Sequence, residues 1–314
     1  MPQTRAWTAS DLPDLTGRIV VVTGANSGLG LETALQLAGK RARIVLACRD
    51  PRKTETAIET IRAAHPGAAL EALPLDLASL ESVRSFSDAF CKAYPELHVL
   101  CNNAGVMALP QRRTADGFEM QLGTNHLGHF ALTGRLLERL LATPGARVVN
   151  VSSTAHRIGR MRFDDLHAER GYRRWRAYGQ SKLANLLFTY ELQRRLERKG
   201  ANVASVACHP GYAATNLQLA GPRLDGSSRM EKVARLSNRL FSQSAAMGAL
   251  PALYAATADD VRGGDYIGPD GFGETWGHPK KVRSSARSHD REVAARLWDV
   301  SEELTGVRFE ALAD

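Results

Sequence analysis

Residues 18–40 read RIVVVTGANSGLGLETALQLAGK, an apolar run followed by a glycine-rich turn and an amphipathic segment. Residues 18–24 have the unbroken apolar character of a strand buried on both faces, and residues 29–40 have helical periodicity. Glycines stand at 24, 28 and 30, between strand and helix, with the spacing G-x-x-x-G-x-G. Glycine permits sharp turns and close approach to a pyrophosphate, and a helix N-terminus offers free N–H groups to phosphates. The stretch therefore predicts a dinucleotide-binding turn.

Strand-like runs and helical segments alternate along the first 210 residues. After the opening stretch, apolar runs predict strands at 42–48, 69–76, 97–105, 146–153 and 201–211. Helical periodicity predicts helices at 51–65, 79–94 (with Ser79 as a cap), 116–142 and 178–199. Strands that are apolar on both faces and alternate with helices indicate a parallel sheet covered on both sides.

No linker, repeat or low-complexity break divides the chain. We therefore predict one α/β domain over residues 1–314, a doubly wound Rossmann-type fold with a parallel sheet of about seven strands and helices on both faces. Its core spans about 16–215, a substrate loop or lid follows at 212–243, and C-terminal elements occupy 244–314.

The composition is that of a soluble globular protein, with 314 residues, 44% hydrophobic and 24% charged. The net charge of +8 fits nucleic acid, an anionic membrane, an arginine-rich genome or a phosphate-bearing cofactor, and does not choose among them. The four cysteines, Cys48, Cys91, Cys101 and Cys208, are far apart, which argues against a zinc site or disulfide framework, so we predict no metal. The first 15 residues lack a signal-peptide pattern and no run approaches about 20 apolar residues, so we expect a cytoplasmic protein without integral membrane contact.

Five motifs follow one another in a set order: TGANSGLG (23–30), NNAG (102–105), Asn125, VNVSS (149–153) and YGQSK (178–182). Together they resemble the short-chain dehydrogenase/reductase family over roughly residues 16–215. The stretches YGQSKLANLLFTYELQRRL (178–196), CHPGYAATNL (208–217) and RLWDVSEELTG (296–306) are similar to its retinol-dehydrogenase-like branch, near protochlorophyllide reductases and WW-domain oxidoreductases.

The resemblance implies four catalytic residues. Tyr178 would act as acid and base, and Lys182, four residues on along a helix, would lower the pKa of the phenol from its ordinary value near 10. The alternative for this pair is a solvated surface contact. Ser153, three residues after Asn150, would bond the substrate oxygen, and Asn125 would hold a water that passes protons to the lysine.

The resemblance also implies which residues bind the cofactor. In an NAD enzyme of this type, an acidic residue at the end of the second strand would bind the ribose hydroxyls, but that place holds Ala47 or Cys48. Arg49 follows, and because a guanidinium pairs well with a 2′-phosphate, this favours NADP(H) over NAD(H). Asp50 lies one residue further on. Asp76 is interpreted as an adenine contact, a helix cap, or both. The predicted cofactor-binding residues are Gly24, Asn26, Ser27, Gly28, Leu29, Gly30, Arg49, Asp76, Leu77, Asn103, Ala104, Gly105, Tyr178, Lys182, Pro210, Gly211 and Thr215, with Asn102 beside them in the supporting turn.

Two segments around the strand ends are candidates for substrate recognition. The segment 154–177 carries seven arginines, interpreted as a solvated face, and Trp175, which would either line the substrate pocket together with Ser153 or pack the inserted segment. The stretch 228–241 is a candidate lid, and His209 is interpreted as structural. A homo-oligomer is possible through the helices at 116–142 and 178–199, unless the segment before Tyr178 covers one of them.

These observations predict an NADP(H)-dependent oxidoreductase that transfers a hydride between nicotinamide and the carbonyl or alcohol group of a lipophilic small molecule. The alternative is a non-catalytic, dinucleotide-sensing regulator on the same fold, although such proteins typically lose a catalytic residue. Nucleic-acid binding through the arginine-rich segment is a third hypothesis, but no recognition motif supports it, so we predict no nucleic-acid partner.

Overall fold

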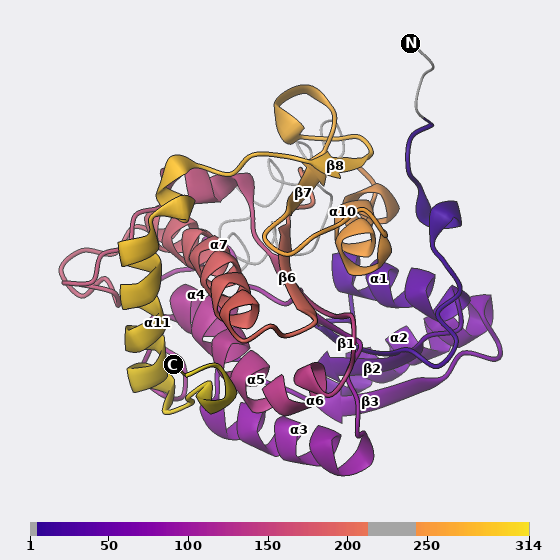
Figure 1. Ribbon diagram of the computed structural model, residues 1–314. Helices are drawn as coiled ribbons and strands as arrows, with labels where there is room; N and C mark the ends of the chain where they lie inside the picture. Colours follow the sequence, from indigo (N-terminus) through magenta and orange to yellow (C-terminus); the bar gives the residue numbers. More distant parts are fainter. Residues whose placement is uncertain (1–4, 213–242, 314) are drawn as a thin grey trace.

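The structure is a computed structural model that describes residues 5–212 and 243–313. Its centre is an eight-stranded sheet in the order β3-β2-β1-β4-β5-β6-β7-β8 (Figure 1). Strands β1 to β7 pair in parallel and β8 pairs antiparallel with β7. The strands are β1 (Ile19–Thr23), β2 (Arg43–Cys48), β3 (Leu70–Pro74), β4 (Val99–Asn102), β5 (Ala146–Val151), β6 (Val203–Cys208), β7 (Tyr266–Pro269) and β8 (Pro279–Lys281).

The sheet confirms the prediction of a doubly wound α/β fold with a parallel sheet of about seven strands, and it adds an eighth, antiparallel strand at one edge. Strand β8 returns beside β7 in the opposite direction. The connection 270–278 is too short for the crossover of a dozen or more residues that a parallel strand requires, so the chain closes a hairpin instead.

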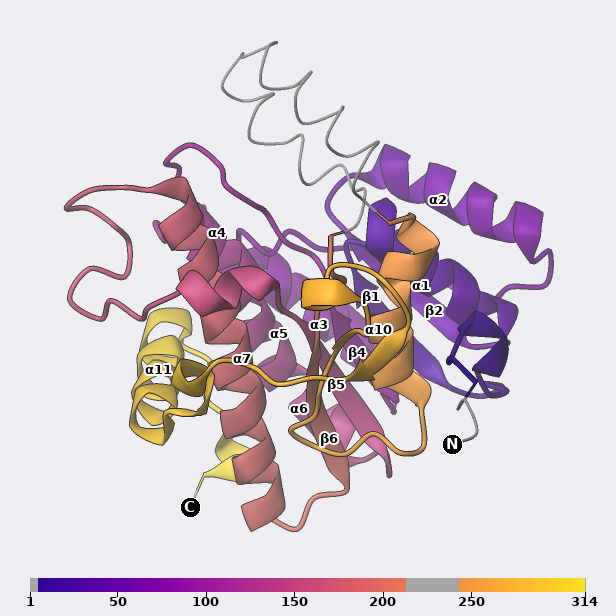
Figure 2. The ribbon, with the colours of Figure 1, turned by 90° about the horizontal axis from the view of Figure 1, so that it is seen from above.

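Helices cover both faces of the sheet, because alternate strand residues point to opposite sides. Val20 and Val22 of β1 face the helices α1 (Gly28–Gly39), α2 (Pro51–Ala64) and α10 (Ala245–Thr257). Val21 faces the opposite layer, which contains α3 (Leu80–Ala93), α5 (Gly128–Arg135), α6 (Leu137–Leu141), α7 (Arg174–Arg198) and α11 (Arg291–Thr305). Figure 2 shows the two layers from above. The remaining short elements are η1 (Ala9–Asp11), α4 (Met120–Leu122), η2 (Gly123–Leu127), η3 (Thr154–Ile158), η4 (Phe272–Glu274), η5 (Ala286–His289) and η6 (Glu310–Leu312).

The predicted helix at 116–142 is interrupted in the structure. It begins at Met120, where Glu119 accepts hydrogen bonds from two backbone N–H groups, and it breaks at Leu136 between α5 and α6. Between α4 and α5 lies η2, a π-helical segment. Hydrophobic periodicity does not report which carbonyl each N–H group bonds, so the sequence pattern could not reveal the π segment.

The predicted boundary at Tyr178 is also wrong, because α7 begins four residues earlier, at Arg174. The residue before α7 is Arg173, whose side chain makes no capping hydrogen bond, so the sequence carries no cap signal there. By contrast, Ser79 caps α3 as predicted, accepting from the Ser82 N–H.

The outer face of α7 is covered by α11 of the same chain. Ala294 and Leu297 pack with Leu183 and Leu187, and the Arg195 guanidinium lies 4.3 Å from the Trp298 ring centroid. The predicted oligomer contact through α7 therefore has part of its surface already occupied, and the oligomer stays a prediction. Within 5–212 and 243–313, none of the helices has the length and apolar character to cross a membrane.

Candidate active site and cofactor pocket

A cavity of about 350 Å³ lies beyond the carboxyl ends of β1 to β4, where the strand order reverses between β1 and β4. Such a reversal is where open α/β sheets bind their ligands. Every residue predicted to bind the dinucleotide from Gly24 to Gly105 lines this cavity. Its other lining residues, which the sequence reasoning did not select, are Ala47, Cys48, Asp50, Lys53, Leu75, Val106 and Thr124.

The glycine-rich turn is shaped for close approach of a ligand. Gly24 and Gly28 have φ angles of 67° and 54°, a region that side chains rarely adopt. A Cβ atom on Gly30 would lie 2.4 Å from the Gly24 carbonyl oxygen. Ser27 is the N-cap of α1 but makes no side-chain capping hydrogen bond, so it does not cover the first N–H groups of the helix. A narrow glycine cradle at a helix N-terminus fits the pyrophosphate of a dinucleotide.

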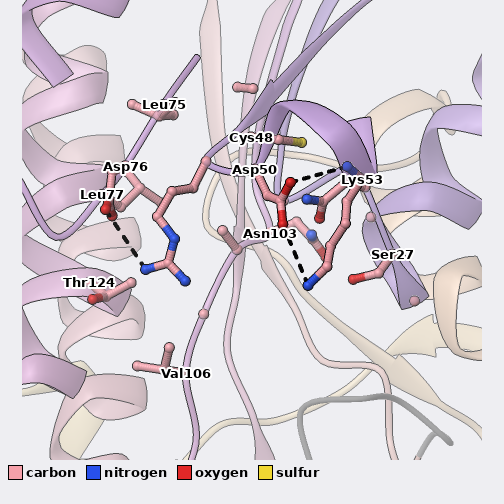
Figure 3. A pocket seen from close by; sticks show the side chains of 18 of the residues that line it. Ser27, Cys48, Asp50, Lys53, Leu75, Asp76, Leu77, Asn103, Val106 and Thr124 are labelled. Carbon is pink, nitrogen blue, oxygen red and sulfur yellow. Dashed lines mark hydrogen bonds and ion pairs between the residues drawn. The ribbon is translucent and has the colours of Figure 1, made fainter. Parts of the chain in front are cut away.

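Four charged side chains line the cavity in two pairs. Arg49 Nη1 lies 3.8 Å from Asp76 Oδ2, and Lys53 Nζ lies 3.7 Å from Asp50 Oδ2. Figure 3 shows Lys53 and Ser27 on one side of the cavity, and Asp76 and Leu77 on the other. Asp50 is the N-cap of α2 and accepts from the Lys53 N–H, so its carboxylate is engaged at the helix start. The cap of α3 is Ser79, and Asp76 instead accepts from the Ala78 N–H.

The turn after β4 is fastened to the end of β1 by Thr23. Its hydroxyl accepts from the N–H groups of Asn103 and Ala104, both at 2.9 Å. The Asn103 side chain donates to the Thr23 carbonyl at 2.8 Å and lines the cavity. Asn102, in contrast, points into the sheet and donates to Asn150 Oδ1 at 2.9 Å, so its part in the turn is to support.

Asn125 lies in the π-helical segment η2, fully buried. Its amide group exchanges two hydrogen bonds with the Val106 backbone, at 2.7 and 2.9 Å, and also donates to Ser181. These bonds join α4–α5, α7 and the turn after β4 at one point. A Cβ on Gly105 would lie 3.1 Å from Asn125 Oδ1 and 3.5 Å from Lys182 Nζ. The cavity therefore ends against Asn125 and Lys182.

Tyr178 and Lys182 are both buried, with 5% and 3% of their surfaces exposed, which excludes the solvated surface pair. The Lys182 ammonium donates to the Val151 carbonyl at 3.0 Å and lies 5.8 Å from the Tyr178 ring centroid. Ser153 follows β5 and is partly exposed, and its hydroxyl bonds that of Tyr178. The neighbouring Ser152 is buried, and its hydroxyl donates to the Lys182 carbonyl.

Burial governs the proton affinity of this pair. It raises the pKa of Tyr178 to about 12, against the lowering effect of the Ser153 hydroxyl. It also lowers the pKa of the Lys182 ammonium to about 8. The prediction that Lys182 depresses the Tyr178 pKa is therefore wrong for the protein itself, because burial of the phenol dominates and the group that opposes it is the Ser153 hydroxyl, not the Lys182 ammonium. Tyr178 is a protonated phenol at neutral pH.

Residues 18–221 match the family model of the short chain dehydrogenases, which covers more than half of the chain. The chain belongs to the short-chain dehydrogenase/reductase family. This short-chain dehydrogenase/reductase is 44% identical to retinol dehydrogenase 12 of Homo sapiens, over 94% of this chain and 89% of the human one. It is 42% identical to retinol dehydrogenase 11 of Homo sapiens, over 93% and 87% of the two chains. It is thus an alcohol/carbonyl oxidoreductase of the retinol-dehydrogenase-like branch, in a family that uses NAD(P).

Solved structures share its fold. A crystal structure of an uncharacterized protein from Mycobacterium Paratuberculosis has a TM-score of 0.80 and 45% identity, and the match covers 97% of this chain and 99% of that one. A short chain dehydrogenase from Shigella flexneri, complexed with NADP, has a TM-score of 0.62 at 21% identity, over 82% and 98% of the chains. At 21% identity, the similarity to the Shigella flexneri structure shows a shared fold alone.

Sequence reasoning missed His129, which braces Asn125 in this short-chain dehydrogenase/reductase. Its Nδ1 lies 3.0 Å from the Asn125 carbonyl oxygen, and its Nε2 lies 3.0 Å from the Thr23 hydroxyl. Burial lowers the pKa of His129 to about 4, so the ring is neutral. The carbonyl can only accept, so Nδ1 carries the proton and Nε2 accepts from Thr23. The signal was available, because residues four apart on a helix share a face.

The loop after β6 is held by the β7–β8 hairpin. Gly211, with φ of 66°, is packed so closely that a Cβ would lie 2.5 Å from the Thr275 carbonyl oxygen. His209 is fully buried, its Nε2 lies 3.1 Å from Glu274 Oε2, and its Nδ1 accepts from the Gly211 N–H at 3.3 Å. These contacts fit the structural role predicted for His209. They also fix the positions of Pro210 and Gly211. Neither residue lines the cavity.

Trp175 lies against the ring of Tyr178. Its ring is 52% exposed and meets the Tyr178 ring edge-on, with centroids 6.1 Å apart. This position favours a wall of the substrate site over packing of the inserted segment. Of the seven arginines nearby, Arg157, Arg162 and Arg170 form ion pairs with acidic residues while remaining partly exposed, as a solvated face would.

Thr215 and the candidate lid at 228–241 lie outside the described residues. Among the residues that the structure does describe, no group of His, Cys, Asp and Glu side chains could hold a metal ion. The four cysteines are free thiols, three of them buried.

Proposed function

We propose that this protein is an NADP(H)-dependent oxidoreductase that transfers a hydride between nicotinamide and a carbonyl or alcohol group of a lipophilic small molecule. One observation carries the proposal: the dinucleotide cavity ends at Gly105, against Asn125 and Lys182. Lys182 in turn lies 5.8 Å from the ring of Tyr178, whose hydroxyl meets that of Ser153. A cofactor site and a proton donor therefore share one edge of the sheet.

The chain's own residues suit the proton half of the reaction. A dinucleotide held by the glycine turn would supply the hydride for reduction or accept it in oxidation. Tyr178, protonated at neutral pH, would donate its proton to the carbonyl oxygen of the substrate. Ser153 Oγ accepts from the Ala155 N–H at 3.2 Å, and its own proton, which meets the Tyr178 oxygen in the free protein, would turn to the same substrate oxygen. Lys182 and Asn125 would hold the cofactor end of the site, with His129 behind them.

Arg49 and Lys53 support NADP(H) as the cofactor. Both side chains line the cavity and are more than two thirds exposed, each with one long ion pair. Exposed pairs contribute about 0–1 kcal/mol, so either cation can exchange its carboxylate for a doubly charged 2′-phosphate at little cost. Asp50, the acidic residue placed to compete for ribose hydroxyls, is engaged as the cap of α2.

Arg49→Asp is expected to raise the Kd for NADPH by about tenfold to a hundredfold, because it removes a charge-assisted contact and adds a repulsion. The Kd for NADH should change little or fall. Fluorescence titration with both cofactors measures the two constants. Arg52→Asp is the matched control, since it makes the same charge change on an exposed residue of α2 that does not line the cavity. Equal Kd values for NADPH in the two variants would remove Arg49 from the 2′-phosphate site.

The surface near Tyr178 supports a lipophilic substrate. The large apolar side chains that are exposed in the described residues all follow the carboxyl ends of β5, β6 or β7: Ile158, Trp175, Tyr212, Phe272 and Trp276. Exposed apolar side chains in the loops after these strand ends, where α/β folds bind their ligands, suit an apolar substrate.

The function is tested by NADPH oxidation with a panel of short and long aliphatic aldehydes, ketones and a retinoid aldehyde. We expect kcat/KM to rise with the apolar area of the substrate. Trp175→Ala should lower kcat/KM for long substrates more than for short ones. Absence of turnover above the background of Tyr178→Phe across the whole panel would rule out the proposal.

A further inference from the structure

His156 bridges the catalytic serine and a distant segment of the chain. It is fully buried three residues after Ser153, in η3. Its Nδ1 lies 2.6 Å from the Ser153 carbonyl oxygen, and its Nε2 lies 3.1 Å from the Ser285 backbone nitrogen. No part of the proposed reaction described above uses this side chain.

The two partners of His156 determine its state. A carbonyl oxygen can only accept, so Nδ1 must carry the proton, and a backbone N–H can only donate, so Nε2 must accept. The ring is therefore neutral and has one tautomer. Burial lowers its pKa to about 4, so this form persists through the neutral range, although Arg157, His209 and Glu274 lie near it.

Ser285 is part of a strap, residues 283–290, that holds η3 at several points. Arg287 Nη1 donates to the carbonyl oxygens of Arg157 at 3.2 Å and Gly159 at 3.1 Å. The Arg157 side chain donates to the Arg283 carbonyl at 3.2 Å. The strap is fastened to α7, the helix that carries Tyr178, by the Ser284 and Tyr190 hydroxyls, 2.7 Å apart. It lies beyond residues 18–221, the part matched by the family model.

We propose that His156 is a positioning residue, which uses the Ser285 N–H as a fixed reference to hold the Ser153 backbone and thereby sets the Ser153 hydroxyl against Tyr178. The inference rests on the proposed function. Ser153 has extended backbone geometry, φ −162° and ψ 156°, and its carbonyl bond to His156 is the contact that the strap controls. If that bond is lost, the Ser153 carbonyl keeps only the backbone N–H of His156, at 3.0 Å, and the strap no longer fixes the orientation of Ser153 toward the substrate oxygen.

Two substitutions separate the two bonds of the imidazole. In His156→Asn, the amide nitrogen takes the place of Nδ1 and can still donate to Ser153. In His156→Gln, the amide oxygen takes the place of Nε2 and can accept from Ser285, but the donor to Ser153 is lost. We expect kcat to fall about threefold to tenfold in the first, which loses only the reference at Ser285, and about tenfold to a hundredfold in the second, which loses the direct bond to Ser153, with the Kd for NADPH unchanged in both. The reverse order of kcat would overturn the proposal.

The coupling to Ser153 is tested by the double variant His156→Gln/Ser153→Ala. If His156 acts through Ser153, kcat of the double variant equals that of Ser153→Ala alone. If the fold-losses of kcat in the two single variants multiply in the double variant, His156 acts on overall packing instead. Because Ser153 lowers the Tyr178 pKa, His156→Gln should also move the basic limb of the pH–rate profile upward for alcohol oxidation, and an unmoved limb contradicts the proposal.

Ser285→Pro provides an independent variant. It removes the N–H donor, and Ser285 already has φ of −68°, which proline adopts. We expect a lower kcat than in Ser285→Ala, which keeps the N–H group; equal values would count against the bridge.

One measurement does not need turnover. Nitrogen-15 NMR of the imidazole should show the Nδ1–H tautomer in the wild-type protein, and the Nε2–H tautomer would overturn the bridge. If this tautomer is found and no substrate is turned over, the proposed function fails and the geometry of His156 stands.

Discussion

Tyr178→Phe is expected to lower kcat for carbonyl reduction by about a hundredfold to ten-thousandfold, the range in which one general acid contributes. The ring and its packing remain, so only the proton donor is lost. The Kd for NADPH should be within about twofold of the wild-type value, because Tyr178 does not line the dinucleotide cavity in the free protein. Steady-state kinetics and cofactor titration measure the two effects separately.

Tyr254→Phe is the matched control for this result. It removes another tyrosine hydroxyl, one that bonds Asp260 on the surface of α10. Its kcat should equal that of the wild type. If Tyr178→Phe kept more than about a tenth of the wild-type kcat, another group would have to donate the proton.

The raised pKa of Tyr178 adds a directional expectation. Reduction requires the phenol, which predominates below about pH 12, whereas oxidation requires the phenolate. The rate of alcohol oxidation should therefore rise with pH across the neutral and mildly alkaline range while reduction stays flat. A bound nicotinamide cation would shift this profile to lower pH without changing its direction.

Acidification from pH 7 to pH 4.5 is expected to destabilise the folded protein strongly, because buried histidines, His126 and His129 among them, must stay neutral. Burial lowers the pKa of His126 to about 3 and that of His129 to about 4. In the unfolded chain both would titrate near 6.5. Between about pH 6.5 and pH 4 the unfolded state therefore binds more protons than the folded state, and the free energy of unfolding falls as pH falls.

The size of the effect follows from the two shifts. One pKa unit corresponds to about 1.4 kcal/mol, so each histidine removes about 3 kcal/mol of stability by pH 4. Two such losses are comparable with the total stability of many domains, about 5–15 kcal/mol. The buried carboxyl of Glu119, whose pKa burial raises, offsets only a part of this at the acid end.

Urea unfolding at a series of pH values between 7.5 and 4.5 measures this dependence. In His126→Gln, the slope of the free energy of unfolding against pH should correspond to about one proton fewer. The variant also loses the contact between the His126 ring and the Ser301 hydroxyl. Circular dichroism and tryptophan fluorescence should report coincident transitions for the analysis to hold. A free energy of unfolding that stays constant or rises between pH 6.5 and pH 4.5 would contradict the assignment of these histidines as buried and neutral.

The sequence by itself determined the fold and most of the residues that line the cavity beyond β1 to β4. The glycines at 24, 28 and 30 follow a buried strand and open a helix, and this local pattern needs no distant contact to be recognised. The ends of parallel strands meet at one edge of a sheet, so Arg49, Asp76 and Asn103 were placed together by topology alone. The order of the motifs along the chain identified the candidate catalytic residues Asn125, Ser153, Tyr178 and Lys182.

Tertiary structure alone decided the properties that depend on burial and on contacts between distant segments. The pKa of Tyr178 is raised because the phenol is buried, which the spacing of Tyr178 and Lys182 cannot reveal. Lys53 reaches the cavity because α2 starts beside α1, and α11 covers α7 because of apolar residues more than a hundred positions apart. His156 meets Ser285 across 129 positions. Local patterns specify which segments become strands and helices, whereas solvent exclusion and long-range hydrogen bonds arise only when those segments have packed together.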